Sequence, residues 1–179
     1  MSIMKIRREP SGITWLHMDD REGRNVFSHG FVQAFLEALE DVEAKGGTKV
    51  LVVQGREDVF CGGAEKKALL DLCDGKAAVI DLVICERLLE TSFPVIAAME
   101  GHGIGGGLAM ALCCDVVIAA RESRYGAVFM NMGFTPGMGC SVLLADLVGQ
   151  FLAAEMLFTG KRFRGSELAS RATNINYIV

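Results

Sequence analysis

Two glycine-rich segments contain the residues of this chain whose types and spacing could support chemistry. The first is FCGGA at residues 60–64, and the second is GHGIGGG at residues 101–107. Each follows an apolar stretch typical of a buried strand and leads into helical sequence, which places bare backbone N–H groups where an anion can be held. Two such groups aimed at one oxygen would form an oxyanion hole, as enolate or acyl chemistry requires.

The second segment also satisfies the G-x-G-x-x-G dinucleotide fingerprint at Gly101, Gly103 and Gly106, with Glu122 as a conceivable ribose-binding acid. However, the motif falls past the middle of the chain, and too little sequence follows it to complete a doubly wound domain. A nucleotide-dependent oxidoreductase and a purely structural tight turn therefore stay as alternatives to the oxyanion site.

The elements that must position these segments can be read from apolar periodicity. Alternation over residues 4–8 and 12–19 predicts a hairpin, and Ser28 is suited to cap a helix that ends at Gly46-Gly47. Further along, strands and helices are predicted in turn over residues 50–54, 65 onward, 77–90, 95–99, 106–112 and 115–119. Strands separated by helices indicate parallel crossover units, and hence an α/β domain.

Composition narrows the protein class. A chain of 179 residues is sufficient for one domain, and a hydrophobic fraction of 51% predicts that some surface meets another subunit. Six cysteines without a C-x-x-C pair, and an N-terminus without an apolar signal segment, favour the reducing cytoplasm.

Charge and hydropathy exclude two kinds of partner. The net charge is −4 and basic clusters are short, so we expect no nucleic acid. No apolar run reaches the roughly 18 to 20 residues of a membrane span, so we expect no membrane insertion either.

From about Met4 to about Ala172 the chain resembles the enoyl-CoA hydratase/isomerase (crotonase) superfamily. The resemblance is carried by RNVFS at 24–28, FCGGA at 60–64, IAAMEGHGIGGG at 96–107, Cys114-Asp115 and MGFTPGMG at 132–139. It is strongest to the polyketide β-branching branch, whose members decarboxylate or isomerise a glutaconyl-type group on an acyl carrier protein. It implies a ββα spiral of parallel sheets with crossover helices and a homotrimer. It further implies a single core domain over residues 1–179 that lacks the family's usual C-terminal helical layer.

The resemblance also assigns site residues. The two oxyanion donors would be the backbone N–H groups of Ala64 and Gly106, and the carrier arm would pass residues 24–27 and 60–63. The acyl pocket would be walled by Ala68, Leu72, Phe129 and Met130. The complete set of expected substrate-binding residues is Arg24, Val26, Phe60, Cys61, Gly62, Gly63, Ala68, Leu72, Gly105, Phe129 and Met130.

Departures from the family pattern restrict the reaction. The two hydratase glutamates correspond to Ala109 and Phe129, which cannot move a proton. The decarboxylase tyrosine and lysine correspond to Ala68 and Leu72, so the pocket is expected to be apolar. Cys61 could be a nucleophile beside the first donor or a small packed residue.

These positions lead to one expected reaction and two alternatives. We expect decarboxylation or isomerisation of an enoyl or glutaconyl thioester through an enolate. The substrate itself would carry CoA or phosphopantetheine, and no metal or other cofactor is expected. The alternatives are a fatty-acid-type hydratase/isomerase with a relocated acid or base, and a catalytically silent thioester-binding or scaffold protein.

Overall fold

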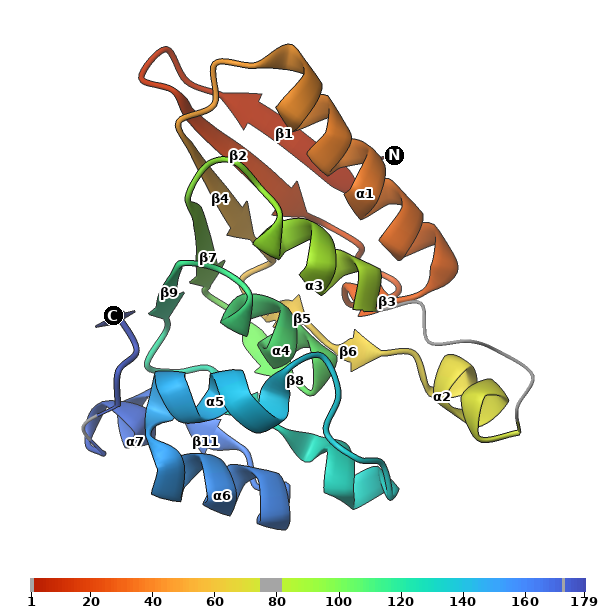
Figure 1. The fold of residues 1–179 in the computed structure, drawn as a ribbon, viewed down its shortest axis with the longest axis vertical. Coiled ribbons are helices and arrows are strands. Elements are labelled where there is room, and N and C mark those ends of the chain that lie inside the picture. The colour runs from red at the N-terminus through yellow and green to blue at the C-terminus, as the bar shows by residue number, and fades with distance from the viewer. Residues whose placement is uncertain (1, 75–81, 172) are drawn as a thin grey trace.

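The larger sheet of the protein confirms the predicted α/β architecture. The computed structural model describes residues 2–74, 82–171 and 173–179. The strand order of the larger sheet is β1-β2-β4-β7-β9-β12, in which β1 is antiparallel to β2 and the other neighbours are parallel (Figure 1). Its strands are β1 (Met4–Arg8), β2 (Ile13–Met18), β4 (Val50–Gln54), β7 (Val95–Met99), β9 (Val116–Ala119) and β12 (Tyr177–Ile178).

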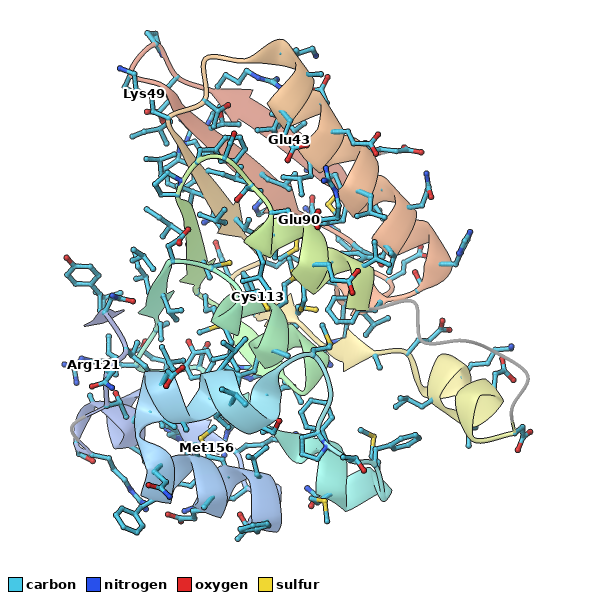
Figure 2. All side chains as sticks on the ribbon, in the orientation of Figure 1. Glu43, Lys49, Glu90, Cys113, Arg121 and Met156 are labelled. Carbon is cyan, nitrogen blue, oxygen red and sulfur yellow. The ribbon has the colours of Figure 1, made fainter. Side chains whose placement is uncertain are left out.

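Three helices follow one another along this sheet. They are α1 (His29–Lys45), α3 (Leu82–Leu89) and α4 (Gly106–Leu112), and α3 contacts both of the others. The Ser28 hydroxyl accepts the Phe31 N–H at 3.2 Å at the start of α1, and Gly46, with a φ of 62°, ends the helix. Arg87 of α3 pairs with Glu43 of α1 at 2.7 Å, and Figure 2 shows Glu43 on the side of α1 toward α3. The helix predicted from residue 77 begins among the described residues at Leu82, and residues 75–81 lie outside them.

A second, four-stranded sheet has the order β11-β10-β8-β5, and β3 pairs with β6 beside it. These strands are two or three residues long, which is too short for apolar alternation to reveal them. They correct the sequence-based expectation that each glycine segment runs directly from strand to helix, because short strands form inside both segments. Their bounds are β3 (Val26–Phe27), β5 (Val59–Cys61), β6 (Gly63–Ala64), β8 (His102–Ile104), β10 (Arg124–Gly126) and β11 (Phe163–Arg164).

The remaining helices lie around the second sheet. The 3₁₀ turn η1 (Val128–Met132) and the helices α5 (Cys140–Val148) and α6 (Gln150–Thr159) were not predicted, whereas β11 followed by α7 (Gly165–Ala169) was. In contacts, α5 joins α4 to α6 and α6 reaches η1, while α2 (Lys66–Cys73) projects to the right of the body in Figure 1. Within the described part of the chain, every helix is too short or too polar to cross a bilayer.

Candidate functional site

The two glycine-rich segments meet backbone to backbone. A Cβ atom added to Gly63 would lie 2.5 Å from the Ile104 carbonyl oxygen and 2.9 Å from the Gly106 nitrogen. A Cβ atom on Gly107 would lie 2.1 Å from the Cys61 carbonyl oxygen. Real Cβ atoms cannot come so close, so β6 can run beside the first turn of α4 only because these positions are glycine. The contact brings the residues expected to donate to an oxyanion, Ala64 and Gly106, next to each other.

Backbone conformation also requires glycine at this junction. Gly63 has a φ of 83° and Gly105 a φ of 56°, which is the left-handed region that disfavours residues with a side chain. The Gly105 N–H donates to the Gly126 carbonyl at 2.8 Å, which fixes the turn before α4. Gly106 itself faces apolar groups, because its Cβ would lie 2.8 Å from Phe27 Cε2 and 3.1 Å from Met138 Sδ.

The loop at Arg24 and Asn25 is held to the first glycine segment by a buried amide. Both residues have positive φ, at 55° and 54°, a conformation that costs of order 1 to 3 kcal/mol when a residue carries a side chain. The Asn25 side chain is fully buried and donates to the carbonyls of Met18 at 3.1 Å and Phe60 at 2.9 Å. The Arg24 carbonyl accepts the Gly62 N–H at 3.2 Å. The two stretches assigned to the carrier arm are therefore one rigid unit.

A pocket of about 340 Å³ opens against this unit. Three expected binding residues line it, namely Arg24, Val26 and Gly62. Sequence reasoning did not place five others there, and no motif could have done so, because β5, β8, β10 and the residue before β11 bring them together: Val59, His102, Ile104, Arg124 and Arg162.

The structure favours the packing interpretation of Cys61. Its thiol is fully buried, donates to the Asn25 carbonyl at 2.9 Å and accepts the Gly63 N–H at 3.4 Å. Burial raises the pKa of the Cys61 thiol to about 12, so it stays protonated and is a poor nucleophile near neutral pH. Phe60 is also fully buried, so only its backbone could approach a substrate.

The residues expected to wall the acyl pocket lie on two elements. Ala68 and Leu72 belong to α2, and their side chains are outside the described part of the chain. Phe129 and Met130 are neighbours on η1, where Phe129 is half-buried against the core and Met130 is 48% exposed. The structure does not describe contacts that join the two pairs into one wall.

The dinucleotide fingerprint has a different geometry here from the one its alternative requires. Gly103 lies in β8 between Cys61 of β5 and Tyr125 of β10, and a Cβ on Gly101 would lie 2.2 Å from the Val59 nitrogen. In nucleotide-binding domains the strand leads through the glycines directly into the helix, whereas here a separate short strand intervenes. The glycines permit this close strand packing.

Comparison with known proteins gives a consistent result. Residues 8–173 match the family described as enoyl-CoA hydratase/isomerase. The bacillaene synthase decarboxylase PksI of Bacillus subtilis is 36% identical over 170 residues, covering 95% of this chain and 68% of that protein. Mouse mitochondrial enoyl-CoA hydratase domain-containing protein 2 is 35% identical over 160 residues, covering 87% of this chain and 54% of its own length. The chain thus spans about half of that mitochondrial relative.

Solved structures agree with the sequence comparison. The ECH2 decarboxylase domain of CurF from Lyngbya majuscula superposes with a TM-score of 0.93 at 34% identity, covering 99% of this chain and 72% of that domain. An enoyl-CoA hydratase from Bacillus anthracis, at 24% identity and a TM-score of 0.88 over 99% of this chain and 70% of its own, shares the fold. The predicted similarity to polyketide β-branching decarboxylases is confirmed by PksI and CurF. With its glycine segments in backbone contact and its match over residues 8–173, the chain belongs to the enoyl-CoA hydratase/isomerase (crotonase) family.

Proposed function

We propose that this protein binds an acyl thioester and converts it by decarboxylation or double-bond isomerisation through an enolate. The observation that carries the proposal is the backbone contact between Gly63 and Gly106, where the added Cβ would lie 2.9 Å from the amide nitrogen. It sets Ala64 and Gly106 side by side at one edge of the carrier-arm unit. The names of PksI and the CurF domain, both decarboxylases, support the same reaction class.

The chemistry follows from where charge develops. In decarboxylation the bond between the acyl chain and its carboxylate carbon breaks, CO₂ leaves, and the electron pair moves into the conjugated thioester. The negative charge gathers on the thioester oxygen, where the N–H groups of Ala64 and Gly106 would donate to it. Carbon protonation then completes the reaction. Apolar groups such as Phe27 and Met138, which face Gly106, would strengthen these hydrogen bonds by excluding water.

A catalytically silent thioester-binding protein is the second candidate. It is favoured by the side chains at the two hydratase acid positions, since Ala109 is fully buried and Phe129 is a half-buried aromatic ring. Neither can donate or accept a proton. The two candidates share the binding geometry and differ in turnover. The carrier in both is CoA or the phosphopantetheine of an acyl carrier protein.

The test compares two unreactive acyl-pantetheine analogues by calorimetry. One replaces the thioester sulfur by CH₂ and keeps the carbonyl, and the other lacks the carbonyl. Two neutral hydrogen bonds of about 0.5 to 1.5 kcal/mol each predict that the parent protein binds the first roughly tenfold more tightly. Gly106→Val should abolish the preference, because its side chain would occupy the space beside Phe27 and Met138.

Gly30→Val is the matched control, because a Cβ at Gly30 meets nothing within 4 Å. It should keep the preference for the carbonyl. Release of CO₂ from a glutaconyl thioester should fall about 10²- to 10³-fold in Gly106→Val, the cost of one oxyanion donor. If folded Gly106→Val kept the carbonyl preference, the thioester site would be elsewhere. Binding with neither CO₂ release nor isomerisation in the parent would establish the silent alternative.

A further inference from the structure

The pocket beside the two glycine segments concentrates unpaired positive charge. Arg24, Arg124 and Arg162 all line it, and none of their guanidinium groups forms an ion pair with any residue that the structure describes. Elsewhere arginines find acids, as Arg87 does with Glu43 at 2.7 Å. In a chain of net charge −4, three unpaired guanidinium groups around one cavity make a local positive field.

The fold maintains this charge at a cost. Arg124 of β10 lies directly opposite Arg164 of β11 in an antiparallel pair, an arrangement in which like charges repel. The stem of Arg162 crosses β10 at Gly126, where a Cβ would lie 3.1 Å from Arg162 Cγ. Arg24 adopts its left-handed φ of 55°. A bound anion would offset both the repulsion and the strain.

Acidic groups near the pocket are engaged with other partners. The Asp58 carboxylate pairs with Arg56 at 2.9 Å, and Glu167 accepts the Arg164 backbone N–H at 2.7 Å. Both carboxylates reduce the field at longer range, Asp58 near Arg24 and Glu167 near Arg124. Neither forms an ion pair with an arginine that lines the pocket.

His102 adds a neutral donor to the same pocket. Its Nδ1 accepts the Arg124 backbone N–H at 3.1 Å, so the single proton of the neutral ring is on Nε2. Burial, and then the charges of Arg24 and Arg124, hold the pKa of His102 below its ordinary range. The polar lining of the pocket therefore offers hydrogen-bond donors to an anion, while Val26, Val59 and Ile104 provide an apolar surface.

We propose that this pocket binds the phosphate of the substrate's pantetheine arm, with Arg124 and Arg162 as the residues that recognise it. The inference rests on the proposed thioester function. Gly62 and Ile104 line the pocket two residues before Ala64 and Gly106, within about 7 Å of them. The apolar surface suits the pantetheine chain, and guanidinium groups bind phosphate oxygens in bidentate fashion. The acyl carboxylate is a poorer occupant, because arginine contacts would stabilise it against loss of CO₂.

The experiment measures the affinity of pantetheine, 4′-phosphopantetheine and CoA by calorimetry. In the parent protein, phosphopantetheine should bind at least about tenfold more tightly than pantetheine, as charge-assisted hydrogen bonds predict. Arg124→Gln and Arg162→Gln should each lose about tenfold for phosphopantetheine and change pantetheine affinity less than about twofold. CoA binding more tightly than phosphopantetheine would identify CoA as the source of the phosphate. Equal affinity would identify a carrier-protein arm, and both outcomes support phosphate recognition.

Arg121→Gln is the matched control. Arg121 is exposed, forms no ion pair with any described residue, and lies outside the pocket lining, at the left edge of the molecule in Figure 2. It removes the same charge and should leave all three affinities unchanged.

Three results would overturn the proposal. They are equal binding of pantetheine and phosphopantetheine by the parent, equal weakening of both ligands by Arg124→Gln and Arg162→Gln, and equal weakening by Arg121→Gln. The proposed function is judged separately by the carbonyl preference and its loss in Gly106→Val. Success there with failure here would remove the phosphate subsite alone.

Discussion

At the scale of single residues, what is missing is as informative as what is present. Ala109 stands fully buried in α4 and Phe129 half-buried in η1, at the positions that correspond to the hydratase glutamates. The proposed chemistry uses backbone N–H groups, which survive such side-chain changes. Proton transfer from these two positions does not survive them.

Hydration of crotonyl-CoA by this protein should therefore be undetectable. Each general acid or base is worth about 10²- to 10⁴-fold, so losing both removes most of the rate. The assay is loss of the enoyl absorbance, with a known hydratase as the positive control. A rate near that of the hydratase would show that a relocated acid or base performs the reaction and would favour the fatty-acid-type alternative.

At the scale of elements, the closeness of α4 to β5 depends on one glycine. A Cβ on Gly107 would lie 2.1 Å from the carbonyl oxygen of Cys61, a backbone atom that cannot rotate away as a side chain could. The helix would have to move outward from the strand. Such a shift would also separate the residues that the proposed oxyanion site needs together.

We expect Gly107→Ala to destabilise the protein by about 3 kcal/mol, the upper part of the range for overpacking a core. Gly30→Ala is the control, because the space around Gly30 in α1 is open and alanine has the higher helix propensity. It should leave the protein equally or more stable. Urea unfolding measures both variants, and an unchanged midpoint for Gly107→Ala would contradict the close backbone contact.

At the scale of the whole molecule, one helix presents aromatic side chains to the surface. Phe151 and Phe158 of α6 are 90% and 79% exposed, and Val142 of the adjoining α5 is 64% exposed. Met156 of the same α6 is buried. Apolar groups this exposed are typical of an interaction surface. They agree with the sequence-based expectation that part of this protein's surface meets another subunit.

We predict that the protein forms a homotrimer in solution. Light scattering combined with size exclusion should give a mass near three chains, and Phe151→Asp should shift the equilibrium toward smaller species if α6 lies in the interface. A matched Ser141→Asp change, at an exposed polar position in α5, should have no effect. A stable monomer across micromolar concentrations would refute the trimer.

The sequence alone determined the elements that depend on local patterns. The hairpin of β1 and β2, the Ser28 cap of α1 and the span of α4 all agree with the structure, because alternation, capping chemistry and helical spacing act within a few residues. The family followed from motifs that are also local, and residues 8–173 confirm it. The expected donors Ala64 and Gly106 stay a prediction whose residues the structure places side by side.

Only the tertiary structure decided the second sheet and the arginine pocket. Its strands hold two or three residues each, too few to show a period, and they pair residues such as Tyr125 with Gly103 and Phe163 across long stretches of chain. Arg124 and Arg162 carry no motif and become neighbours of Arg24 only when these strands assemble. Side-chain type can be read along a chain, but convergence in space depends on long-range contacts that no local pattern records.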